Sequence, residues 1–90
     1  MEADGLIEIF PNPVMNDARI RLTCAHDASV TLQLFDLTGS RRLELWEGPL
    51  ESMVERTIEF NTGDLPAGVY FLRMTTDMES SYVRKFIVLE

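Results

Sequence analysis

A chain of 90 residues is long enough for one domain, because globular domains average about 100 to 150 residues. Its hydrophobic content of 46% supplies enough apolar side chains for a compact core, which excludes a disordered chain. Eight basic against fifteen acidic residues give a net charge of −7, which repels phosphate backbones and anionic membranes and excludes nucleic acid as a partner.

Apolar and polar residues alternate with a period of two along most of the chain, and turn-forming residues recur at short intervals. This pattern is typical of an antiparallel sandwich or barrel and not of helices. The pattern predicts seven strands, at residues 6–10, 18–24, 29–37, 41–46, 53–60, 69–76 and 82–89. The fold class is therefore predicted to be all-β.

The first half of the chain shows the alternation most clearly. We expect the first strand to end at Pro11-Asn12-Pro13, because both prolines lack a backbone donor and fix φ. In the next two strands every second residue is apolar and is predicted to face the core: Ile20, Leu22, Cys24, Val30, Leu32 and Leu34. The segment from Asp36 to Gly39 then fits a type I turn, with aspartate first and glycine fourth.

The fourth and fifth predicted strands are less regular. The fourth carries Leu43 and Leu45 on one face, so Trp46 is predicted to point to solvent, and Gly48-Pro49 closes this strand. In the fifth strand we expect three apolar residues to face inward, with a cation interrupting them at a sheet margin. These residues are Val54, Ile58 and Phe60, and the cation is Arg56.

The segment Leu65-Pro66-Ala67-Gly68 is predicted to form a turn. Pro66 suits its second position, and Gly68 can adopt a positive φ without steric cost. The following strand places Tyr70, Leu72 and Met74 on one side, and residues 77–80 form the turn to the last strand.

Cys24 and His26 lie two residues apart, and a thiol beside an imidazole can form a nucleophile. Catalysis also needs an orienting group and an oxyanion site in a pocket, and so small a sandwich offers little concave surface. A zinc site needs three or four ligands. We therefore interpret Cys24 as a core residue and His26 as a turn residue, and we assign no catalytic residue.

Oxygen donors in the predicted loops suggest calcium as an alternative: Asp17, Asp36, Asp64, Asp77, Asn12, Asn16 and Asn61. They occur one or two per turn, whereas the ligands of a calcium loop follow each other at close alternating spacing. In turns such side chains ordinarily bond their own backbone. We therefore predict no metal site and no cofactor.

Three aromatic residues, Trp46, Tyr70 and Tyr82, raise a different alternative. Together they could form a platform on which a sugar stacks, as in a carbohydrate-binding sandwich. Core packing explains them equally well. A carbohydrate-binding or fibronectin-like adhesive module of an exported protein therefore stays open as an alternative function.

Three segments in a fixed order give the sequence a family resemblance. They are Ile-Glu-Ile-Phe-Pro-Asn-Pro at 7–13, Val-Thr-Leu-Gln-Leu-Phe-Asp-Leu-Thr-Gly at 30–39, and Leu-Pro-Ala-Gly-Val-Tyr-Phe-Leu-Arg at 65–73. With the basic and then apolar stretch from Arg84 to Val88, they resemble the C-terminal sorting domain of the type IX secretion system of Bacteroidetes. Any one segment alone is a weak signal, but the ordered set is specific and covers nearly the whole chain.

This resemblance implies an immunoglobulin-like β-sandwich of about seven antiparallel strands over residues 6–90, which ends a larger cargo protein. Residues 1–5 would be a lead-in or linker, and the cargo, not this domain, would perform any chemistry. In that family an outer-membrane translocon recognises the domain after the cargo reaches the periplasm. A surface sortase then removes it, by analogy near or before residues 2–5, and the cargo ends at the cell surface or is secreted.

The resemblance also implies which residues carry the sorting signal: Pro11, Asn12, Pro13, Asp36, Gly39, Leu65, Pro66, Gly68, Tyr70, Lys85 and Phe86. One departure is Ser40, which stands where the family often has arginine, so the first cation shifts by one position to Arg41. We hypothesise that the last strand and the Gly68 turn form the surface that faces the translocon, by strand addition or groove docking. The expected partners are the translocon, the sortase and the upstream cargo, and no membrane-spanning segment is expected.

Overall fold

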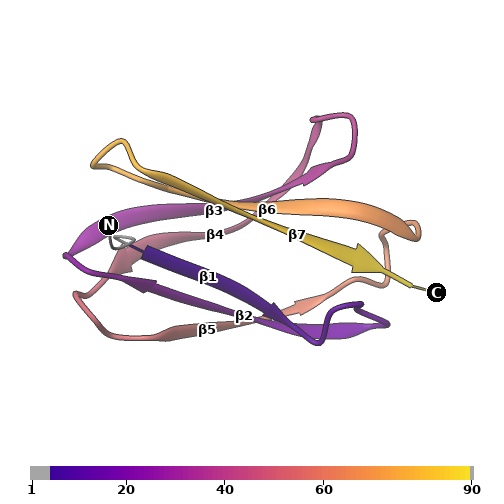
Figure 1. Cartoon of the computed structure of the whole chain (residues 1–90), viewed down its shortest axis with the longest axis horizontal. Coiled ribbons are helices and arrows are strands. Elements are labelled where there is room, and N and C mark those ends of the chain that lie inside the picture. Colours follow the sequence, from indigo (N-terminus) through magenta and orange to yellow (C-terminus); the bar gives the residue numbers. More distant parts are fainter. Residues whose placement is uncertain (1–4, 90) are drawn as a thin grey trace.

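A computed structural model of the chain describes residues 5–89, with the backbone alone at 41 and 42. Its seven strands are β1 (Gly5–Phe10), β2 (Asp17–Cys24), β3 (Ala28–Asp36), β4 (Arg41–Leu50), β5 (Arg56–Asn61), β6 (Gly68–Thr76) and β7 (Ser81–Val88). They form a three-stranded sheet, β1-β2-β5, and a four-stranded sheet, β4-β3-β6-β7, and neighbouring strands are antiparallel (Figure 1). This arrangement is an immunoglobulin-like β-sandwich, and the predicted fold class is confirmed.

The hydrophobic core lies between the two sheets and follows the period of two that the sequence shows. Its fully buried side chains come from both sheets and include Ile20, Leu22, Leu32, Leu34, Leu72, Met74 and Phe86. Burying one such side chain contributes about 1.5–3 kcal/mol, so packing of this kind can hold a small sandwich together. Cys24 is buried in the same cluster, and its interpretation as a core residue is confirmed.

The predicted end of the fourth strand at Gly48-Pro49 is wrong, because β4 continues to Leu50. Proline is tolerated here since Pro49 pairs with Ser29, whose N–H and C=O both point away from β4. They bond Asp77 instead, with the Ser29 amide donating to Asp77 Oδ1 and the Asp77 amide donating to the Ser29 carbonyl. The missing donor of Pro49 therefore costs the β3–β4 ladder no hydrogen bond.

The expectation that Trp46 points to solvent is also wrong. Leu32 pairs with Trp46 while Gln33 pairs with Glu44, so Leu45 is an extra residue that forms a β-bulge. The bulge turns Trp46 to the side of the buried Leu32, and Trp46 packs half-buried against the core. A bulge breaks the period of two, so alternation alone assigns the wrong face after it.

The fifth strand begins later than the predicted residue 53, and Val54 is half exposed and does not face the core. Residues 51–55 instead pack against the β2–β3 turn, where the Met53 amide donates to the Cys24 carbonyl and the Ser52 amide donates to Asp27 Oδ1. Arg56 opens the edge strand β5, which agrees with the predicted sheet margin.

The connections between the strands lie at the two ends of the long axis, along which the molecule extends 37 Å. One end holds Gly5 and the β2–β3, β4–β5 and β6–β7 turns, and the other holds the β1–β2, β3–β4 and β5–β6 connections and the end of β7 (Figure 1). Of the expected lead-in, Gly5 is the first residue of β1, and residues 1–4 lie outside the described residues.

Candidate functional site

The predicted sorting residues meet at the second of these ends, which we call the signature end and define as residues 10–17, 36–40, 61–70 and 85–89. Strand register brings them together: Tyr70 is the partner of Asp36 on one side and of Phe86 on the other. Gly68 pairs with Val88 in the same way. Segments that are far apart in the sequence thus form one continuous end of the molecule (Figure 1).

The Pro11-Asn12-Pro13 segment lies along the outer edge of β7. Asn12 uses both ends of its side-chain amide there: Oδ1 accepts from the Ile87 amide at 3.0 Å, and Nδ2 donates to the Lys85 carbonyl at 3.5 Å. The peptide bonds that precede Pro11 and Pro13 are both cis. The Asn12 amide therefore mimics a peptide group of a neighbouring strand.

Val14 continues this contact with its backbone. Its amide donates to the Ile87 carbonyl at 2.8 Å, and the Leu89 amide donates to the Val14 carbonyl at 2.7 Å. Val14 and Val88 form a parallel bridge, and both side chains are buried. The outer edge of β7 is therefore occupied over residues 85–89 by the chain itself, which protects an otherwise exposed edge.

The turn before β6 is fixed by Tyr70, a residue of the type called a tyrosine corner in immunoglobulin-like folds. Its hydroxyl donates to the Pro66 carbonyl at 2.6 Å, and its ring stacks on Phe86 with 5.8 Å between ring centroids. Leu65 packs against the core beneath this turn. Gly68 has a φ of 154°, so the predicted positive φ is confirmed.

The β3–β4 turn is held by one carboxylate. Asp36 Oδ1 accepts from the Thr38 amide at 2.9 Å and from the Ser40 amide at 3.1 Å. The Gly39 amide donates to the Asp36 carbonyl at 3.0 Å, as in a β-turn, and Gly39 has a φ of 88°. The predicted turn is confirmed, and the aspartate serves its own backbone.

The predicted sorting residues divide into a buried and an exposed group. Tyr70 and Phe86 are buried and support the signature end from within, and Asp36, Leu65 and Gly68 are half-buried. The exposed group is Pro11, Asn12, Pro13, Gly39, Pro66 and Lys85. A partner protein can touch this second group most readily.

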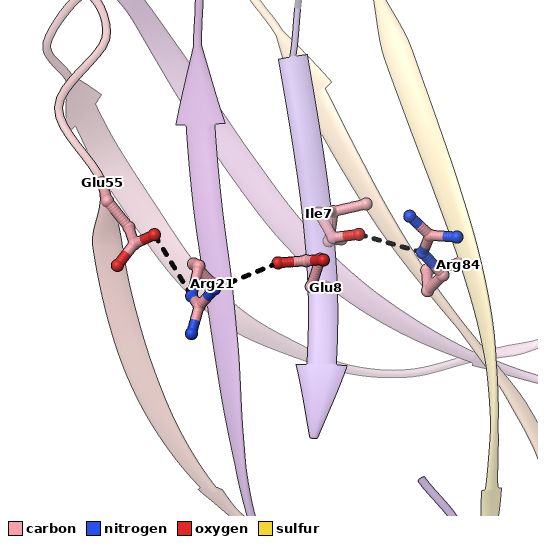
Figure 2. Close-up of polar contacts among 5 residues, drawn as sticks. All are labelled: Ile7, Glu8, Arg21, Glu55 and Arg84. Carbon is pink, nitrogen blue, oxygen red and sulfur yellow. Dashed lines mark hydrogen bonds and ion pairs between the residues drawn. The ribbon is translucent and has the colours of Figure 1, made fainter. Parts of the chain in front are cut away.

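Arg84 contributes a contact that sequence reasoning missed. Its Nε donates to the Ile7 carbonyl at 3.0 Å and so joins β7 in one sheet to β1 in the other (Figure 2). On the outer face beside it, Arg21 lies between Glu8 and Glu55, with nitrogen–oxygen distances of 3.4 and 3.2 Å. The partner of Arg84 is a backbone carbonyl, and no sequence pattern marks such an acceptor.

The residues considered for a nucleophile or for a calcium site lie in different surroundings. Cys24 is buried while His26 is exposed, and the hollow that both line has a volume of about 30 Å³, enough for one or two water molecules. The Asp17 carboxylate accepts a hydrogen bond from the Asn61 side chain, and Asp77 lies at the opposite end. Within residues 5–89, no group of three or more histidine, cysteine or acidic residues is placed to hold a metal ion.

The three aromatic residues do not form a sugar-stacking platform. Tyr70 is only 5% exposed, and its ring stacks on Phe86. The guanidinium carbon of Arg56 lies 4.8 Å from the centre of the Trp46 ring and covers one of its faces. Tyr82 packs half-buried against the core.

No helix of the described residues has the length and apolar character needed to cross a membrane.

We compared the chain with models of known protein families and with curated proteins. The family model described as the secretion system C-terminal sorting domain matches residues 8–89. A search of curated proteins gives no match.

Two solved structures show the same fold. The crystal structure of dimeric latent PorU from Porphyromonas gingivalis is similar with a TM-score of 0.79 and 20% identity, over 98% of this chain and 10% of that chain. A mutant β-glucosidase from Listeria innocua in complex with laminaribiose is similar with a TM-score of 0.50 and 14% identity, over 96% of this chain and 16% of that chain. The chain thus spans a small part of the length of either protein.

Proposed function

The chain belongs to the family of secretion system C-terminal sorting domains, the sorting signals of the type IX system, and we propose that the outer-membrane translocon recognises it by its signature end. Sorting domains of this family are generally non-catalytic and belong to exported proteins. We further propose that this chain performs no reaction itself and acts as an address for a cargo protein.

The observation that carries this proposal is the meeting of the three motif segments and the end of β7 at one end of the sandwich. Asp36 and Phe86 are both register partners of Tyr70, although they belong to different motif segments. A surface of this kind exists only when the module is folded. The translocon would therefore read a folded shape and not a linear peptide.

We propose that the cargo lies away from this surface, and the position of β1 supports this arrangement. Gly5 begins β1 at the end opposite the signature end, and the molecule extends 37 Å along this axis. A cargo joined before β1 would leave from that opposite end (Figure 1). The translocon and the sortase would then act at opposite ends, and cleavage near residues 2–5 would leave the signature end untouched. The cargo would pass through the periplasm and finish at the cell surface or in the medium.

The occupied edge of β7 bears on the mode by which the translocon would bind the chain. Asn12 and Val14 already pair with β7 over residues 85–89, so a partner strand cannot add there without displacing them. Docking on the exposed turns needs no such displacement. Of the two hypothesised modes, this occupied edge favours groove or turn docking over strand addition at residues 85–89.

An export assay tests the proposal. The chain is fused behind a periplasmic reporter in a Bacteroidetes strain that carries the type IX system, and reporter at the cell surface and in the medium is measured. Arginine is introduced at two exposed turn positions of the signature end, Thr38 and Ala67, and at Met78 in the opposite β6–β7 turn as the matched control. We expect Thr38→Arg and Ala67→Arg to lower export about tenfold, as interface hot spots do, and Met78→Arg to export like the parent.

Point variants are preferable to deleting residues 85–90, because that deletion removes Phe86 and Val88 from the core. Export of all three variants at the parental level would contradict recognition by the signature end. A parent fusion that stays in the periplasm would contradict the sorting role itself.

A further inference from the structure

The edges of the two sheets differ in how they are protected. The end of β7 is paired with residues 12–14, and the outer edge of β1 lies beside β7, where Arg84 donates to the Ile7 carbonyl. The edge of β4 is interrupted by the bulge at Leu45 and by Pro49, which lacks a backbone donor. Features of this kind hinder another strand from pairing with an edge. The remaining edge is that of β5.

The hydrogen bonds of β5 show which of its backbone groups face outward. The Thr62 amide donates to the Asn16 carbonyl, and bonding alternates along an antiparallel pair, so every second residue counted back from Thr62 turns its backbone groups toward β2. The amides and carbonyls of Thr57, Glu59 and Asn61 therefore point away from β2. Within residues 5–89, no group accepts from or donates to them. The strand contains no proline and no bulge, so its outer edge is open.

The side chains around this edge leave room for another strand. The guanidinium carbon of Arg56 lies 4.8 Å from the centre of the Trp46 ring, so this charge is turned toward β4 of the same chain. Thr57 and Glu59 are exposed on the outer face of the sheet. A hollow of about 380 Å³, lined by residues 50, 51 and 54–57, lies beside the start of β5. The end of a second, antiparallel strand would lie next to this hollow.

We propose that a second copy of this chain adds to the open edge, so that two β5 strands pair antiparallel across a two-fold axis. The two three-stranded sheets then become one continuous sheet. Backbone pairing requires that outward residues lie opposite outward residues, and this leaves few registers. An axis at Thr57 or at Phe60 would overlap only part of β5, so the registers with an axis at Ile58 or at Glu59 are the candidates.

Charge selects between these two registers. An axis at Glu59 would set the Glu59 carboxylates of both copies directly opposite each other, which is destabilising. An axis at Ile58 instead places Thr57 opposite Glu59 of the second copy, twice by symmetry, and sets the half-buried Ile58 against its counterpart. The sequence of β5 is therefore complementary to itself in one register, which is the reason for assigning the edge to a second copy.

The expected dimer is weak. Each copy carries a net charge of −7, and pairing of a six-residue strand buries less surface than a standard interface, so we expect a dissociation constant on the order of 0.1 mM. The dimer goes beyond the sorting function and does not depend on it.

Charge changes at Thr57 test the edge by sedimentation equilibrium of the chain. Thr57→Lys should tighten the dimer about tenfold, because it forms two pairs of opposite charge with Glu59, and Thr57→Glu should weaken it about tenfold. Thr31 is the matched control, because it pairs with a glutamate, Glu47, inside one chain. Thr31→Lys and Thr31→Glu should associate like the parent. Thermal unfolding of each variant checks that the domain stays folded.

Cysteine cross-linking tests the register. Ile58→Cys should form a disulfide-linked dimer with oxidised glutathione, because facing Cβ atoms at such a position lie about 4.5 Å apart. Glu59→Cys should not, since its two copies would be diagonal neighbours at about 7–8 Å. The parent is the control, because its Cys24 is buried.

Two results would overturn the dimer. They are a parent that sediments as a monomer at about 1 mM, well above the expected dissociation constant, and Thr57 variants that associate alike. Cross-linking of Glu59→Cys but not of Ile58→Cys would overturn the proposed register. None of these results bears on the export assay, so the dimer and the sorting function fail separately.

Discussion

Tyr70 links the interior of the sandwich to the turn before β6. Its ring stacks on Phe86, and its hydroxyl donates to the Pro66 carbonyl at 2.6 Å. We predict that Tyr70→Phe, which keeps the ring and removes the hydroxyl, lowers the free energy of unfolding by about 1 kcal/mol. Urea denaturation measures this change. Tyr82→Phe is the control, because the Tyr82 hydroxyl has no partner among the described residues. Equal losses of stability in both variants would contradict the role of the Tyr70 hydrogen bond.

Glycine is required at position 68 because of the backbone conformation there, and not because a side chain would lack space. Its φ is 154°, and a Cβ atom at this position would meet no atom within 4 Å. We predict that Gly68→Val lowers the free energy of unfolding by about 1 kcal/mol or more, because a β-branched residue is strained at this φ. Gly68→Ala should show most of the same loss, since the strain comes from the backbone. A thermal unfolding curve that neither substitution moves would show that the turn does not need this conformation.

At the scale of elements, the β3–β4 and β6–β7 hairpins close with the same pattern of hydrogen bonds. The first residue of each turn, Asp36 or Thr76, donates its amide to the carbonyl four residues later, and its side-chain oxygen accepts two amides of the turn. The fourth residue has a positive φ in both: 88° at Gly39 and 63° at Glu79. Glycine thus occupies this position in one hairpin and glutamate in the other.

This difference predicts opposite effects of two substitutions. Glu79→Gly should raise the free energy of unfolding by about 0.5–1 kcal/mol, because glycine adopts a positive φ without the steric cost that glutamate has. Gly39→Ala should lower it by a similar amount. Chemical denaturation of the two variants beside the parent measures both effects, and a change of the same sign in both would contradict the shared turn geometry.

Asn12 holds the end of β7 through its side-chain amide. We predict that Asn12→Ala lowers the free energy of unfolding by about 1 kcal/mol, since two hydrogen bonds to exposed backbone groups are lost. Hydrogen exchange of the Ile87 amide should become faster, because this amide donates to Asn12 Oδ1. Asn16→Ala is the matched control, because Asn16 contributes its backbone carbonyl to the fold. Unchanged exchange at Ile87 would contradict the edge contact.

Strands with uninterrupted alternation were predictable, and the irregular ones were not. In β2, β3 and β6 the buried residues are apolar except Thr76 at the end of β6, so the period of two identifies both the strand and its face. In β4, the bulge at Leu45 shifts the period, and Pro49 lies in the strand because its partner Ser29 bonds elsewhere. Both features depend on the neighbouring strand, which the sequence of β4 alone does not contain.

At the scale of the whole molecule, the family resemblance names candidate sorting residues, and their sorting role stays a prediction, but it does not say how they contact one another. The Asn12 contact with Ile87 spans 75 residues, and the Arg84 contact with Ile7 spans 77. The family resemblance names these segments without their spatial relation. Two antiparallel sheets bring the segments to one end, because β1, β3 and β5 each run into this end and are followed there by a short connection, and β7 ends there.

Hydrogen–deuterium exchange on a reporter fusion held in the translocon tests the role of the signature end most directly. We predict slower exchange at Asn12 and at residues 36–40 and 63–68 in the complex than in the isolated fusion. The turns of the other end, at residues 25–27, 51–55 and 77–80, should exchange equally in both. Protection confined to that other end, with the signature end unchanged, would contradict recognition by the gathered motif segments.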